Sequence, residues 1–82
     1  MQFIDEYIAE RSLRKTSSGI GFNSYTLIWD NKPLLVIWST LELKPISVYW
    51  QTLDSASIDE LGAFMTRMLS ELHDDSLLED KE

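Results

Sequence analysis

Apolar residues near the N-terminus recur at a helical spacing. Phe3, Ile4, Tyr7 and Ile8 fall on one side of a helix, and charged residues occupy the other side. The acids of this segment precede its bases, which is the order that the helix dipole favours. The pattern predicts a helix over about residues 2–14, ended by the polar segment 16–19.

A longer helical pattern lies near the C-terminus. Apolar residues recur there at spacings of three and four: Ile58, Leu61, Met65, Met68 and Leu72. Ser57, with Glu60 three positions later, forms a capping box. We therefore predict an amphipathic helix over about residues 56–73. Gly62 lies at the edge of its apolar stripe, where it would let another backbone approach closely.

Three segments between the helices are rich in β-branched and aromatic residues: 25–29, 34–40 and 46–51. Their connections are short, and Pro33 and Pro45 stand at strand starts, where a missing N–H does no harm. The order predicts an α+β fold, α-β-β-β-α, with a three-stranded antiparallel meander and two amphipathic helices. Residues 1–73 then form one globular domain, and residues 74–82 form an acidic tail.

The strand pattern is apolar on both faces. With the first turn placed at Asn31-Lys32, one face pairs Trp29 with Leu34, Leu27 with Val36 and Tyr25 with Trp38, and the other pairs Ile28 with Leu35 and Thr26 with Ile37. One helix on each face would bury everything. Two helices on one face would leave a patch made of Ile28, Leu35, Ile37 and Tyr49. Trp50 joins one face or the other according to the register of the second hairpin, which the sequence leaves open.

Charge is unevenly distributed along the chain. Fourteen acids and seven bases give a net charge of −7, and the whole of this negative charge comes from residues 54–82. The negative electrostatic field of such a segment repels nucleic acid and attracts basic surfaces. The longest apolar run, residues 34–38, is far shorter than the ~20 residues of a membrane span. No secretory signal is visible, so the expected location is the cytoplasm.

Residues that could carry chemistry are few. His73 is the only histidine and the chain has no cysteine, so a metal site lacks ligands. Ser17, Ser18, Ser24 and Ser39 have no adjacent base, and Gly19-Ile20-Gly21 lacks the remainder of a phosphate-binding fingerprint. The acid pairs 59–60 and 74–75 fall on solvated helix ends. We expect no catalytic, metal or cofactor site, and no enzyme.

Two binding hypotheses remain. In the first, the protein inhibits or modulates a partner with a basic surface, such as a nucleic-acid enzyme, as small phage and mobile-element proteins do. Its acidic contact set is Asp59, Glu60, Glu71, Asp74, Asp75, Glu79 and Asp80. In the second, the protein is a homodimeric chaperone-like or escort protein with an apolar sheet or helix face. Its interface set is Ile28, Leu35, Ile37, Tyr49 and Trp50, and Met65 and Met68 would suit an adaptable helix surface.

Overall fold

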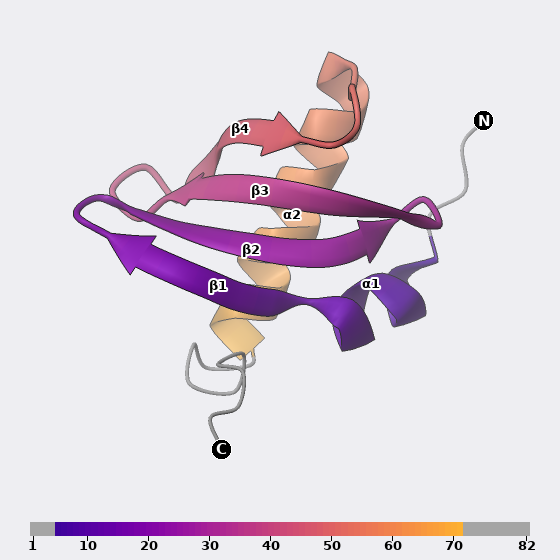
Figure 1. The fold of residues 1–82 in the computed structure, drawn as a ribbon, viewed down its shortest axis with the longest axis horizontal. Helices are drawn as coiled ribbons and strands as arrows, with labels where there is room; N and C mark the ends of the chain where they lie inside the picture. The colour runs from indigo at the N-terminus through magenta and orange to yellow at the C-terminus, as the bar shows by residue number, and fades with distance from the viewer. Residues whose placement is uncertain (1–4, 72–82) are drawn as a thin grey trace.

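The computed structural model describes residues 5–71 and shows a small α+β domain. Its elements are α1 (Glu6–Ser12), β1 (Arg14–Gly19), β2 (Phe22–Trp29), β3 (Lys32–Ser39), β4 (Lys44–Tyr49) and α2 (Ser55–Glu71). The strands form one antiparallel sheet in the order β1-β2-β3-β4. Helix α2 crosses behind this sheet, and α1 lies at one end of it (Figure 1). The predicted class is confirmed, and the predicted number of strands is wrong.

The missed strand is β1. The sequence predicted that the first helix continues to about residue 14 and that a polar loop follows. Helix α1 instead ends at Ser12, whose hydroxyl accepts a hydrogen bond of 2.7 Å from the Ile28 N–H on β2. Strand β1 contains no large apolar residue and pairs with β2 around a bulge between Lys15 and Ser17. A polar edge strand gives no alternating pattern, because its backbone bonds and not side-chain burial hold it.

The turn between β2 and β3 lies at Asp30-Asn31, one residue before the predicted tip. Both residues have positive φ angles, 58° and 64°, as the tight turns that match the twist of a hairpin require. The true pairs include Tyr25 with Val36 and Leu27 with Leu34, so the predicted register is wrong by two residues. A shift of two leaves every side chain on its predicted face, because strand side chains alternate with a period of two.

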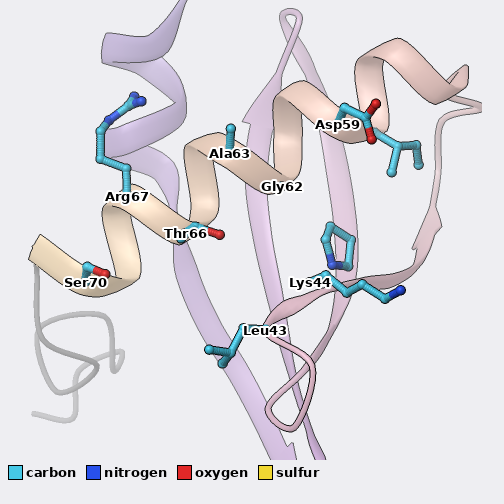
Figure 2. A pocket seen from close by; sticks show the side chains of 10 residues that line it. Leu43, Lys44, Asp59, Gly62, Ala63, Thr66, Arg67 and Ser70 are labelled. Atoms are coloured by element: carbon cyan, nitrogen blue, oxygen red, sulfur yellow. The ribbon is translucent and has the colours of Figure 1, made fainter.

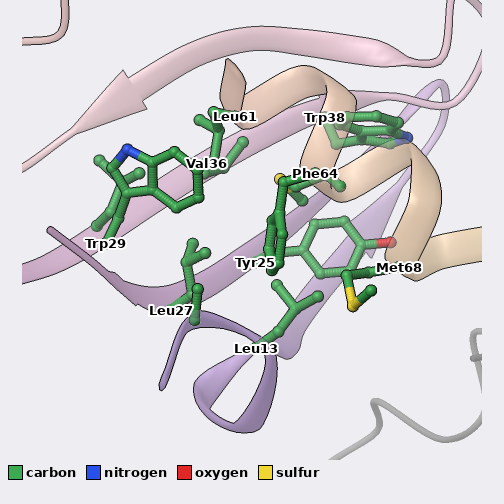
Figure 3. Packing of buried hydrophobic residues seen from close by; sticks show 12 residues of the cluster. Leu13, Tyr25, Leu27, Trp29, Val36, Trp38, Leu61, Phe64 and Met68 are labelled. Carbon is green, nitrogen blue, oxygen red and sulfur yellow. The ribbon is translucent and has the colours of Figure 1, made fainter. Parts of the chain in front are cut away.

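The core lies between one face of the sheet and α2. It is made of Ala9, Leu13, Tyr25, Leu27, Trp29, Leu34, Val36, Trp38, Leu61, Phe64, Met65 and Met68. Trp29 packs on Phe64 with 5.5 Å between ring centroids (Figure 3). Met65 and Met68 are buried, so they belong to the core and do not form the adaptable surface that was considered for them. Ala9 and Leu13 bring α1 into the same core as α2.

Helix α2 begins at Ser55, and its N-cap lies three residues before the predicted cap at Ser57. The Asp54 carboxylate accepts a hydrogen bond of 2.8 Å from the Ser57 N–H, and its carbonyl accepts one from the Ile58 N–H. Asp54 is therefore the residue that satisfies the free donors of the first turn. The predicted cap at Ser57 is wrong, since Ser57 already stands inside the helix.

This cap makes stability depend on pH. The hydrogen bond from the Ser57 backbone, followed by one from its side chain, lowers the pKa of Asp54 below its ordinary value. A lowered carboxyl pKa contributes stability above the unfolded value, about 3.9, and this contribution is lost as pH falls through the folded pKa. We expect Asp54→Asn, which keeps an accepting oxygen without the charge, to lose less stability than the native chain between about pH 5 and about pH 2. Urea unfolding at the two pH values measures this, and equal losses would contradict it.

Candidate functional site

One face of the sheet carries no helix within residues 5–71. Both helices pack into the core on the opposite face, and Glu6 of α1 bonds Arg67 of α2 at 2.7 Å on that side. The face nearest the viewer in Figure 1 is therefore uncovered by any described element. This is the arrangement for which the sequence predicted an exposed patch, and we call this surface the open face.

The strand register arranges the open face in rows. One row runs across the sheet through Arg14, Thr26, Leu35 and Tyr49, and the next runs through Ser17, Ser24, Ile37 and Ser47. Ile28 lies beside Pro33 at the end near the β2–β3 turn. Ile28, Leu35 and Ile37 are half-buried, and Tyr49 is 51% exposed. The apolar centre of the open face is thus a stripe along β3, Leu35 and Ile37, with Ile28 beside it, and the neighbouring strands place Thr26, Ser24 and Ser47 next to this stripe. A strand on the solvated face of an antiparallel sheet usually carries polar residues at such positions.

Hydroxyl groups flank this apolar centre toward β1. The Ser24 hydroxyl lies 2.6 Å from that of Ser17 and 3.0 Å from that of Thr16. Ser24 is itself buried, although it lies on the uncovered side of the sheet. Because these hydroxyls bond one another, a partner that covers them leaves fewer polar groups unpaired.

Trp50 follows β4 directly and is 65% exposed. Its φ of 79° is unusual for a bulky residue and turns the chain out of the strand. The next residue, Gln51, holds this turn, since its side-chain amide donates to the carbonyl oxygens of Trp29, Lys32 and Pro33 at 3.0–3.1 Å. Trp50 therefore lies beyond the paired register, and that register assigns it to neither face.

The strands also differ from the rest of the chain in charge. They contain four bases, Arg14, Lys15, Lys32 and Lys44, and no acid. None of the acids among residues 5–71 lies in a strand. The open face is consequently a surface without carboxylates on a molecule whose net charge is −7.

Only two members of the predicted acidic contact set have described side chains, so the set stays a prediction. Asp59 and Glu60 are exposed in the first turns of α2. Glu71 is the last residue of that helix, and the structure describes its backbone but not its side chain. Asp74, Asp75, Glu79 and Asp80 lie outside the described residues, as does His73.

A groove on the helical side of the molecule was not predicted. It has a volume of about 630 Å³ and runs between α2 and the start of β4 (Figure 2). Its lining is Leu43, Lys44, Pro45, Ile58, Asp59, Gly62, Ala63, Thr66, Arg67 and Ser70. The one sequence signal was Gly62, where an added Cβ would lie 3.3 Å from the Pro45 ring. The close approach expected at Gly62 is made by this ring and not by a backbone.

The described residues also show whether a metal site or a membrane-spanning helix is present among them. Within residues 5–71, His, Asp and Glu form no group of three or more that could hold a metal ion. Neither α1 nor α2, over that range, reaches the length and apolar character needed to cross a membrane. Comparison of the chain with protein-family models, curated proteins and solved structures finds no match.

Proposed function

We propose that this chain is a non-catalytic protein-binding module that pairs with a second copy through the open face. One observation carries the proposal: β3 is apolar on both of its faces, yet the described helices cover only one. Leu34 and Val36 are fully buried under α2, whereas Leu35 and Ile37 point to the uncovered side. Uncovered apolar residues on a sheet face are typical of an interaction surface.

The open face is large enough for a small dimer. Four strands about 4.8 Å apart and eight residues of about 3.4 Å each make it roughly 19 Å by 27 Å. Its flat area is then on the order of 500 Å², and projecting side chains add to it. The smallest stable interfaces bury about 600 Å² on each partner, so a second copy seated face to face approaches this requirement.

Charge favours a second copy on this face over other contacts between copies. Two chains of net charge −7 repel each other wherever their carboxylates meet. The strands contain no carboxylate, so pairing through them keeps the acidic helices of the two copies apart. The pair would present its acidic sides outward, where a partner with a basic surface would bind. That second contact stays a prediction, because most members of its residue set lie outside the described side chains.

Sedimentation equilibrium on the full chain tests the proposal. We expect a monomer–dimer equilibrium between about 1 μM and about 1 mM, a range that corresponds to binding energies of about 8 to 4 kcal/mol. An apolar interface should persist at high salt, because salt screens the repulsion between the two acidic chains. The measurement is made at low and at high salt. A chain that stays monomeric to about 1 mM in both conditions would refute the proposed function.

A further inference from the structure

We propose that two neighbouring hairpin tips at one end of the sheet insert into the surface of a lipid bilayer. The side chains concerned are Ile20 in the β1–β2 turn and Leu41 and Leu43 in the β3–β4 loop, and we call this surface the apolar tip. It lies at one end of the strands and not on the open face, so the inference does not depend on the proposed dimer. Binding at a bilayer surface needs no membrane-spanning segment.

The apolar tip is highly exposed. Ile20 and Leu41 are the two most exposed large apolar residues within residues 5–71, at 102% and 84%, and Leu43 is 62% exposed. Their two loops lie side by side at the same end of the sheet (Figure 1), where the Thr40 N–H donates to the Gly21 carbonyl oxygen at 3.1 Å. The strand order thus brings apolar side chains from two separate turns to one place.

Apolar residues at these positions are contrary to ordinary turn chemistry, which favours Gly, Pro, Asn, Asp and Ser. Leu43 has a φ of 60°, a conformation that is strained for a bulky residue and that glycine or asparagine adopts more easily. Neither Leu41 nor Leu43 belongs to the buried core. Because the fold gains little from leucine at either position, a binding role explains these residues better than a structural one.

The backbone of the β3–β4 loop is suited to an apolar environment. The Glu42 N–H donates to the Ser39 hydroxyl at 2.8 Å, and the Leu43 N–H donates to the Ser39 carbonyl oxygen at 2.9 Å. The Thr40 N–H is paired with the neighbouring turn, as described above. Unpaired backbone donors are strongly unfavourable in lipid. These three donors already have acceptors within the chain, so the loop can leave water without exposing them.

Charges beside the tip balance each other. Glu42 and Lys44 flank its leucines and form an exposed ion pair at 3.4 Å. Because charged groups are unfavourable in hydrocarbon, this pair limits insertion to the headgroups and the outer part of the acyl chains. The net negative charge of the chain comes from residues 54–82 and would be repelled by anionic headgroups. A zwitterionic surface, such as phosphatidylcholine, is therefore the expected partner.

The apolar tip suits lipid better than a protein partner. It comprises residues 20–21 and 40–43, whereas each side of a standard protein interface contributes about 20–30 residues. The residues that dominate binding energy at protein interfaces are mostly Trp, Tyr and Arg, and leucine is under-represented among them. A few aliphatic side chains are sufficient for weak partition into a bilayer surface.

Cosedimentation of the full-length chain with phosphatidylcholine vesicles tests the proposal. The three aliphatic side chains together are slightly smaller than a myristoyl chain, whose partition constant is about 10⁴ M⁻¹, so we expect half of the protein to bind at about 0.1–1 mM accessible lipid. Leu41→Ser should weaken binding about tenfold or more, because it removes the apolar area that enters the bilayer. Trp50→Ser should leave binding unchanged, because it removes an exposed apolar side chain from the opposite end of β4.

A fluorescent label locates the contact. The chain contains no cysteine, so Ile20→Cys and Trp50→Cys each provide a single attachment site for a nitrobenzoxadiazole dye, whose emission rises in an apolar environment. We expect vesicles to increase the emission of the dye at position 20 and to leave that of the dye at position 50 unchanged. Equal increases at the two positions would mean that the chain has no preferred orientation on the bilayer, and would overturn the proposal.

Other outcomes would overturn it as well. The first is an absence of binding at about 10 mM lipid. The second is binding that requires anionic lipid and disappears at high salt, because it would come from the basic residues of the strands. In the absence of vesicle binding, a loss of dimer in Leu41→Ser would assign the tip to a second copy, and the loss of a captured protein would assign it to a protein partner. Vesicle binding alone leaves the sedimentation test of the proposed dimer unchanged.

Discussion

Replacing Trp29 by alanine is expected to lower the free energy of unfolding by about 3–5 kcal/mol, the range typical of large aromatic residues in protein cores. Trp29 is fully buried and packs on Phe64 across the interface between β2 and α2. Its indole N–H is buried without a hydrogen-bond partner among the described residues, so the loss comes from packing and not from a broken hydrogen bond. A small domain has only about 5–15 kcal/mol in total, and the variant should be largely unfolded at moderate urea concentrations.

Urea unfolding in dilute protein, followed by circular dichroism, measures this effect. Trp50→Ala is the matched control, because it removes the same side chain from a position that is 65% exposed. We expect the control to change stability by no more than about 0.5 kcal/mol. Similar losses in the two variants would mean that Trp29 does not hold α2 against the sheet.

Replacing Leu35 by glutamate is expected to weaken self-association about 100-fold or more, which corresponds to about 2.8 kcal/mol. Leu35 lies at the middle of the open face, between Thr26 and Tyr49 in neighbouring strands. In the proposed dimer the substitution would bury two carboxylates without a counter-charge, and such burial is strongly unfavourable. In the monomer the same side chain meets water, so the fold should lose only about 1 kcal/mol or less from cross-strand contacts.

Sedimentation equilibrium measures the dimer, and circular dichroism confirms that the variant is folded. Ala56→Glu makes the same change of charge on an exposed position of α2, away from the open face and the groove lining. We expect this control to associate as the native chain does. If both variants associate alike, the interface must lie on another surface.

The sequence predicted the faces of the sheet better than its pairing. Tyr25, Leu27 and Trp29 were placed together on one side, and this prediction survived an error of two residues in the register because the error was even. The amphipathic stripe of α2 was also predicted correctly over the described residues, since Ile58, Leu61, Met65 and Met68 repeat through it at spacings of three and four. Strand β1 was invisible because its six residues carry no large apolar side chain. A polar edge strand forms because its backbone pairs with the adjacent strand, and the pattern of its own residues does not show this pairing.

The two candidate surfaces, the open face and the groove, differ in how much of each could be predicted from local sequence patterns. Ile28, Leu35, Ile37 and Tyr49 were predicted as a patch on the condition that both helices share one face, a condition that depends on tertiary packing. The groove brings residues 43–45 against residues 58–70, which are far apart in the sequence. Gly62 was the one residue whose position in the sequence pointed to a close contact there. A surface formed by segments that are distant in the sequence cannot be predicted from the spacing of residues within one segment.

The simple strand order has a consequence for how fast the chain folds. Every strand pairs with its neighbour along the chain, and connections between strands span only a few residues. Loop closure therefore costs little entropy, and the β2–β3 hairpin can form on the scale of about 1–10 μs. We expect the sheet to assemble from these local hairpins before α2 docks on it. Refolding should then be complete in milliseconds, sooner than in a β-sandwich of similar size, whose strands must find distant partners.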